Sequence, residues 1–213
     1  MTDEVIVLVH GLWMNGLDMQ LLRVRLARAG YTTVLFRYAT VRSAPADNAR
    51  RLHRFAHQLA ARTLHFVGHS LGGLVIRHLF DMAPDLPPGR VVTLGTPHRG
   101  SSAAAALSRL TMGRLLLGQS LDQGLLGGAP GWSRRHELGS IAGSLRFGLG
   151  LMIPGIAAPS DGTVSVAETV CTGMQDHAVV GASHFGLLLS AAAARQCLAF
   201  LRHGRFDHLP FQS

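Results

Sequence analysis

The chain has 213 residues, of which 47% are hydrophobic and 15% are charged, a composition that fits one folded domain over residues 1–213 and excludes a disordered or fibrous protein. The formal net charge is +8, and every basic residue is an arginine. Because these arginines are scattered along the chain instead of forming one patch, we interpret them as solvated surface residues and expect no nucleic-acid partner.

Short apolar runs rich in β-branched residues alternate with segments of helical periodicity along most of the chain. The predicted strands cover residues 5–9, 32–38, 64–68, 91–94, 138–142 and 178–181. The predicted helices cover residues 19–29, 45–62, 71–82 and 187–202. This alternation implies that helices connect parallel strands, so we expect an α/β fold with about six mostly parallel strands and helices on both faces.

Residues 101–136 interrupt this alternation. They begin with an alanine- and leucine-rich stretch, which predicts a helix, and continue with the glycine-rich run Q-S-L-D-Q-G-L-L-G-G-A-P-G, which predicts a loop. A second, apolar connection covers residues 147–158. Residues 101–136 are therefore a candidate lid or cap within the single domain.

One serine lies between glycines where the third predicted strand meets its following helix. Gly68-His69-Ser70-Leu71-Gly72 fits G-x-S-x-G, the nucleophile elbow. The strand-to-helix turn is so tight that side chains two residues before and after the serine would clash, which explains the glycines. The start of a helix also favours developing negative charge. We therefore predict Ser70 as a nucleophile that Gly68, His69 and Gly72 support.

A serine hydroxyl needs a base to accept its proton and an acid to orient that base. In folds with this elbow the order along the chain is serine, acid, histidine. Asp161 lies in the turn P-S-D-G, and His184 follows the last predicted strand directly. Both positions come after predicted strands, where active sites of parallel sheets lie. The sequence therefore predicts Asp161 as the acid and His184 as the base.

Other acidic residues and histidines fit these roles less well. Asp176 and His177 are at the start of the last predicted strand, which is the wrong end of the sheet, and Asp122 is in the glycine-rich middle. His98, in G-T-P-H-R-G, is at a strand end but precedes the acid along the chain. We therefore expect His98 on the wall of the substrate pocket.

An acyl-transfer site also needs two donors for the oxyanion of the tetrahedral intermediate. One is predicted to be the backbone N–H of Leu71, the residue after the nucleophile. We expect the second to be the backbone N–H of Leu12, in the loop after the first strand, where Gly11 allows close approach of the backbone. His10 is interpreted as a brace for this loop, and Trp13 as part of the pocket wall.

The motifs V-L-V-H-G-L-W, F-V-G-H-S-L-G-G, G-T-P-H-R-G-S, S-D-G-T-V-S-V and S-H-F-G-L-L occur in this order from residue 5 to about residue 200. Together they resemble the small bacterial lipases and esterases of the α/β-hydrolase superfamily, in particular the triacylglycerol-lipase-like and PGAP1-like proteins. The resemblance implies hydrolysis of a small-molecule or lipid carboxylic ester through an acyl-enzyme, with Ser70, His184 and Asp161 as the triad and with no metal or organic cofactor.

The chain is short compared with secreted members of that group, so any lid comes from residues 101–136 or 147–158. Both segments carry large apolar side chains that either line an acyl pocket or belong to ordinary packing. These side chains are Leu115, Leu116, Leu117, Leu121, Leu125, Leu126, Phe147, Leu149, Leu151, Met152 and Ile153.

Two alternatives to an esterase stay open. An acyl-thioesterase or acyltransferase would use the same triad, and no motif separates an ester from a thioester substrate. A non-catalytic scaffold of this fold would bind a ligand or an anionic membrane, although such scaffolds commonly lack a triad member and none is missing here.

The sequence also carries expectations about location. No apolar run reaches the roughly 18 residues that a membrane span requires. The start, M-T-D-E-V-I-V, is acidic and unlike a secretory leader, so we expect a cytoplasmic protein. Cys171 and Cys197 are too few for a disulfide framework and are expected to be free thiols.

Overall fold

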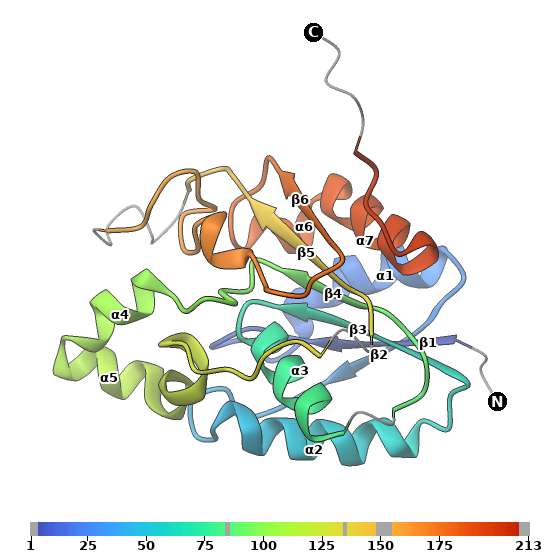
Figure 1. Cartoon of the computed structure of the whole chain (residues 1–213), viewed down its shortest axis with the longest axis horizontal. Coiled ribbons are helices and arrows are strands. Elements are labelled where there is room, and N and C mark those ends of the chain that lie inside the picture. Colours follow the sequence, from blue (N-terminus) through green and yellow to red (C-terminus); the bar gives the residue numbers. More distant parts are fainter. Residues whose placement is uncertain (1–3, 84–85, 134–135, 148–154, 209–213) are drawn as a thin grey trace, which may run out of the picture.

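The structure is a computed structural model that describes residues 4–83, 86–133, 136–147 and 155–208. Its centre is a sheet of six parallel strands in the order β2-β1-β3-β4-β5-β6 (Figure 1). The strands are β1 (Glu4–Val9), β2 (Thr32–Phe36), β3 (Thr63–His69), β4 (Val91–Leu94), β5 (Leu138–Gly143) and β6 (Asp176–Val180). The predicted α/β class and number of strands are confirmed.

Helices cover both faces of the sheet (Figure 1). One face is covered by α1 (Gln20–Arg28), α6 (Gly186–Leu189) and α7 (Ala191–His203). The other face is covered by α2 (Pro45–Gln58) and α3 (Leu71–Met82). Two further helices, α4 (Ser102–Ser108) and α5 (Thr111–Leu117), follow β4 and project beyond the carboxyl ends of the strands.

The continuous apolar run of β1 is explained by this double cover. Ile6 and Leu8 belong to the apolar cluster under α1 and α7, whereas Val5, Val7 and Val9 belong to the cluster under α2 and α3. Successive side chains of a strand point to opposite faces, so a strand of a parallel sheet that is covered on both faces needs apolar residues at every position.

Several element bounds differ from the prediction. The last predicted helix is divided at Ser190, whose backbone is extended and whose side chain accepts the N–H of Ala193, so that it caps α7. Residues 119–131 are predicted as loop, and a short 3-10 turn (Gly118–Ser120) overlaps their start, whereas Asp122, Gln123 and Gly124 have non-helical backbone angles. The predicted connection 147–158 lies largely outside the described residues.

Substitution of buried and exposed strand valines tests this arrangement. Val92 of β4 is fully buried, whereas Val179 of β6 is 51% exposed. We expect Val92→Ala to lower the free energy of unfolding by about 2–3 kcal/mol, because it removes buried methyl groups and leaves a cavity. Val179→Ala should change it by only about 0.5 kcal/mol. Urea denaturation of both variants measures the difference, and equal losses would contradict the assigned burial.

Candidate active site

Asp161 and His184 form a hydrogen-bonded pair. Asp161 lies in the loop that follows β5, and His184 lies in the loop that follows β6. The Nδ1–H of His184 donates to Asp161 Oδ2 over 2.7 Å, and the backbone N–H of His184 donates to the Asp161 carbonyl over 2.9 Å. The second carboxylate oxygen, Oδ1, accepts the N–H groups of Thr163 and Val164 over 2.9 and 2.7 Å. Asp161 is fully buried. These contacts fix the position of the carboxylate and the orientation of the imidazole ring that donates to it.

Glycines make room for this pair at the ends of β4 and β5. A Cβ at Gly95, just after β4, would lie 3.0 Å from His184 Nδ1 and 3.1 Å from Asp161 Oδ2. A Cβ at Gly143, the last residue of β5, would lie 2.7 Å from the Cβ of Asp161. Sequence reasoning did not single out these glycines, although both stand at the end of a predicted strand.

Ser70 lies between β3 and α3 with a strained backbone. Its φ of 53° and ψ of −121° belong to a region that residues with a side chain rarely adopt. A Cβ at Gly72 would lie 2.2 Å from the Val9 carbonyl oxygen, and one at Gly68 would lie 2.7 Å from the Gly73 nitrogen. Glycine is thus required at both positions, because backbone atoms of neighbouring segments lie where a side chain would begin.

The sheet register brings Ser70 close to His184. The N–H of Ser70 donates to the Leu94 carbonyl over 2.9 Å, at the end of the neighbouring strand. The preceding residue, His69, donates its Nε2–H to the His184 carbonyl over 3.0 Å, and the two rings are 4.8 Å apart. No hydrogen bond joins the Ser70 hydroxyl to His184 among the described residues, and such bonds often form only in the complex with substrate.

The loop after β1 passes directly beside Ser70. A Cβ at Gly11 would lie 3.1 Å from the Cβ of Ser70. In the described part of the chain neither Leu12 N–H nor Leu71 N–H has a hydrogen-bond partner, whereas Trp13 N–H donates to the Thr40 hydroxyl over 3.2 Å. The two amides predicted as oxyanion donors are therefore available for a ligand.

His10 braces this loop, as expected. Its ring stacks on Tyr38 at 4.4 Å, its Nδ1–H donates to the Gly11 carbonyl over 3.0 Å, and its Nε2 accepts Tyr38 N–H over 3.4 Å. The Tyr38 hydroxyl donates to the His10 carbonyl over 2.7 Å. Burial lowers the pKa of His10, which keeps the ring neutral and able to donate from one nitrogen and accept at the other.

Trp13 lies at the rim between this loop and α5. Its indole is 57% exposed, and its Nε1–H donates to the Leu116 carbonyl over 3.0 Å. The leucines of residues 115–126 divide into two groups. Leu117, Leu121 and Leu125 are buried against the start of α3, whereas Leu115, Leu116 and Leu126 are exposed. Ordinary packing thus accounts for the first group only.

His98 is held against β4 and α3 by hydrogen bonds. Its ring is buried, its Nε2 hydrogen-bonds the Thr93 hydroxyl over 2.9 Å, and its carbonyl accepts a bond from the buried Arg77. These contacts make His98 a support of the loop after β4, and its place on the pocket wall stays a prediction.

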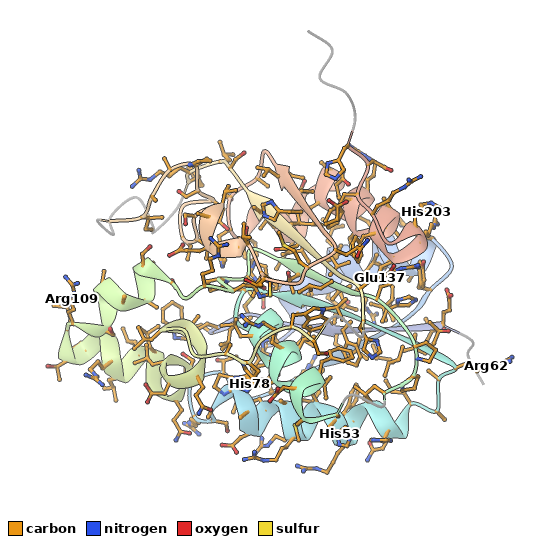
Figure 2. The ribbon with its side chains drawn as sticks, in the orientation of Figure 1. His53, Arg62, His78, Arg109, Glu137 and His203 are labelled. Carbon is orange, nitrogen blue, oxygen red and sulfur yellow. The ribbon has the colours of Figure 1, made fainter. Side chains whose placement is uncertain are left out.

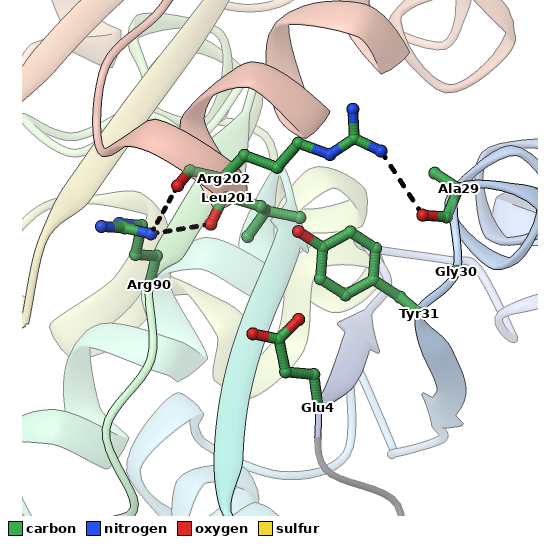
Figure 3. A pocket seen from close by; sticks show the side chains of 7 residues that line it. All are labelled: Glu4, Ala29, Gly30, Tyr31, Arg90, Leu201 and Arg202. Carbon is green, nitrogen blue, oxygen red and sulfur yellow. Dashed lines mark hydrogen bonds between the residues drawn. The ribbon is translucent and has the colours of Figure 1, made fainter.

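A cavity of about 340 Å³ lies at the other end of the sheet (Figure 3). It is lined by Glu4, Ala29, Gly30, Tyr31, Arg90, Leu201 and Arg202. Arg90 donates to the carbonyls of Leu201 and Arg202, and Arg202 donates to the carbonyl of Ala29. These guanidinium groups tie the end of α7 to the amino ends of the strands, away from the pair of Asp161 and His184.

The described residues contain no group of three or more histidine, cysteine, aspartate or glutamate side chains placed to hold a metal ion. No helix among them has the length and apolar character that crossing a bilayer requires. Cys171 and Cys197 are buried free thiols, as predicted.

Comparison with known proteins agrees with this architecture. The alpha/beta hydrolase family matches residues 6–212, and the chain belongs to this family. The lipase BlEst2 of Bacillus licheniformis in its mature form superposes with a TM-score of 0.68 at 19% identity, covering 95% of this chain and 92% of the lipase. Carboxylesterase CesB of Bacillus subtilis superposes with a TM-score of 0.62 at 15% identity, covering 95% and 84%. These likenesses show the fold.

Curated relatives match over a shorter stretch. Triacylglycerol lipases of Pseudarthrobacter phenanthrenivorans and Burkholderia plantarii are each 39% identical to this chain over 64 residues. The match spans 28% of this chain and 20% and 18% of the two lipases. The resemblance to bacterial lipases and esterases that the motifs predicted is confirmed.

Buried neutral histidines predict acid sensitivity. Burial lowers the pKa of His65 to about 4 and that of His69 and His98 to about 3, from an ordinary value of 6.5. Between these values the unfolded chain binds more protons than the native protein, so stability falls as the pH falls from 6.5 towards 4. Each histidine contributes up to about 1.4 kcal/mol per pH unit.

Urea denaturation at pH 7 and pH 5 measures this effect. His65→Gln should make the loss between the two pH values smaller, because one buried titrating group is removed. His203→Gln, a change at an exposed residue at the end of α7, serves as the control and should leave the pH dependence as it is. Equal stability of the unmodified protein at both pH values would contradict neutral burial of the three rings.

Proposed function

We propose that this protein is a serine hydrolase of carboxylic esters that works through an acyl-enzyme, with Ser70 as nucleophile, His184 as general base and Asp161 as the acid of the triad. The observation that carries the proposal is the buried Asp161–His184 pair beside a serine held at φ 53° in an elbow. The family and the named lipases and esterases among its relatives support the same class of reaction.

In this mechanism the Nε2 of His184 takes the proton of the Ser70 hydroxyl as the oxygen attacks the ester carbonyl. Asp161 accepts the Nδ1–H, which leaves Nε2 as the basic nitrogen and stabilises the imidazolium that forms. The unpartnered N–H groups of Leu12 and Leu71 receive the oxyanion, and the start of α3 favours its charge.

The second half of the reaction uses the same groups. His184 returns the proton to the leaving alcohol, then activates the water that releases the acid and regenerates Ser70. The exposed indole of Trp13 and the exposed side chain of Leu116 offer an apolar surface beside the elbow, which favours an ester with an apolar acyl part.

Hydrolysis of p-nitrophenyl esters from acetyl to palmitoyl tests the proposal. Ser70→Ala should lower kcat by about a millionfold, because no nucleophile remains, while the oxyanion donors keep the residual rate about 10³- to 10⁴-fold above the reaction without enzyme. Ser108→Ala, at the end of α4, is the matched control and should keep full activity. If the unmodified protein hydrolyses none of these esters but cleaves acyl thioesters, the ester assignment fails; if it cleaves neither, the enzymatic assignment fails.

Asp161→Asn tests the role of the acid separately. The amide keeps the size of the side chain but favours the wrong imidazole tautomer, so kcat should fall about 10⁴-fold. The variant should still be acylated by a fluorophosphonate probe, slowly, because Ser70 is present. If the Asp161→Asn variant keeps activity within a few fold of the unmodified protein, Asp161 is ruled out as the triad acid.

A further inference from the structure

Glu168, which the sequence did not single out, joins two segments that lie far apart in the chain. It is half-buried in a short 3-10 helix (Ala167–Thr169) between β5 and β6. Its Oε1 accepts the backbone N–H of Ser102 over 2.6 Å, and its Oε2 accepts the backbone N–H of Ser165 over 2.7 Å. Both bonds are short, as expected for a charged acceptor.

The first segment held by Glu168 is the start of α4. Ser102 is the first residue of this helix, where the N–H groups have no partner inside the helix. The side chain of Ser101 accepts the N–H of Ala104, and Glu168 accepts that of Ser102. The Glu168 carbonyl also accepts the N–H of Arg99, in the loop that leads to α4.

The second segment is the loop that carries the triad acid. Asp161 accepts the N–H groups of Thr163 and Val164 through its Oδ1, and Glu168 accepts that of the next residue, Ser165. Three consecutive amides of the loop are therefore held by two carboxylates, one of which is the partner of His184. A shift of either carboxylate displaces the turn between them.

The contacts continue from α4 to the other side of the site. In the helix that follows, α5, the carbonyl of Leu116 accepts the indole N–H of Trp13, which is the residue after the proposed oxyanion donor Leu12. The segment α4–α5 is therefore hydrogen-bonded at both ends. Leu116 in α5 contacts the loop after β1, which carries Leu12 and Trp13, and Ser102 in α4 contacts Glu168, in the loop that carries Asp161 (residues 161–168, the acid loop).

We propose that Glu168 is a positioning residue that couples the segment α4–α5 to Asp161, so that the place of α4 sets the orientation of the triad acid. The proposal rests on the function proposed above. It assigns the α4–α5 segment a role in aligning the reacting groups, in addition to any contact that the segment makes with substrate.

Ser102→Pro isolates this coupling. Proline is favoured at the first position of a helix and lacks only the N–H that Glu168 accepts. Ser101 is already in the extended conformation that precedes proline, and the Ser102 hydroxyl has no partner to lose. Glu168→Gln is the complementary change, because its amide oxygen can accept only one of the two backbone N–H groups and its NH2 group cannot accept the other.

Two measurements report on the acid loop in these variants. The first is kcat for an acetyl ester per active site, counted with a fluorophosphonate probe, so that a smaller folded fraction does not enter the result. We expect a loss of about tenfold to a hundredfold, with KM unchanged, because a small displacement of a catalytic group has an effect of this order. The second is the low-field proton resonance of the His184–Asp161 hydrogen bond, which should shift or broaden.

Glu137→Gln is the control for removal of a surface carboxylate. Glu137 pairs with Arg90 and lies well away from the turn between α4 and α5 that Arg109 marks (Figure 2). It should alter neither measurement. The double variant Ser102→Pro, Glu168→Gln should be no slower than Glu168→Gln alone, since either change by itself breaks the bridge between α4 and the loop of Asp161.

The proposal is overturned if Ser102→Pro keeps both the unmodified kcat and the unmodified low-field resonance, even where Glu168→Gln is impaired, because Glu168 would then act on the acid loop alone. If the unmodified protein hydrolyses no ester, the proposed function fails. The resonance still decides the coupling in that case, since it needs no turnover.

Discussion

The candidate site depends on how closely the main chain can approach itself at the carboxyl ends of β1, β3 and β4. The carbonyl oxygen of Val9 lies where a side chain at Gly72 would begin, and the loop at Gly11 lies against the Cβ of Ser70. This approach holds Ser70 in its strained conformation, because the surrounding strands leave the serine no room to relax. It also explains why the residues two positions before and after the nucleophile, Gly68 and Gly72, are glycines.

Buried neutral histidines connect the loops around Ser70 through their hydrogen bonds. His69 donates to the carbonyl of His184, and His10 joins Gly11 to Tyr38 by donating from one nitrogen and accepting at the other. Burial lowers the pKa of both rings, so each keeps the neutral state that these contacts require. Two of the histidines around the site therefore act through their shape and hydrogen bonds, while His184 is the one paired with a carboxylate.

Carboxylates have a comparable structural role on the opposite side of the site. Asp161 and Glu168 together accept four backbone N–H groups, from Ser102 and from three consecutive residues of the acid loop. Between β5 and β6, the described residues 155–175 contain only an isolated bridge and a short 3-10 helix, so these carboxylates supply hydrogen bonds that a longer strand or helix would otherwise provide. The conformation of the loop that carries Asp161 thus depends on the position of α4, a helix much earlier in the chain, because Glu168 contacts both.

The amino-acid sequence by itself determined the class of fold, the six strands and the local geometry around Ser70, because these depend on apolar periodicity and on glycines within a few residues of one another. It also located Asp161 and His184 at the correct end of the sheet, since chain order and strand ends are readable locally. Only the tertiary structure decided that His98 supports the loop after β4, that Ser190 divides the last helix, and that Glu168 bridges two loops. Such contacts join residues far apart in the chain, and which partner a side chain reaches is decided by packing of whole elements that no short pattern records.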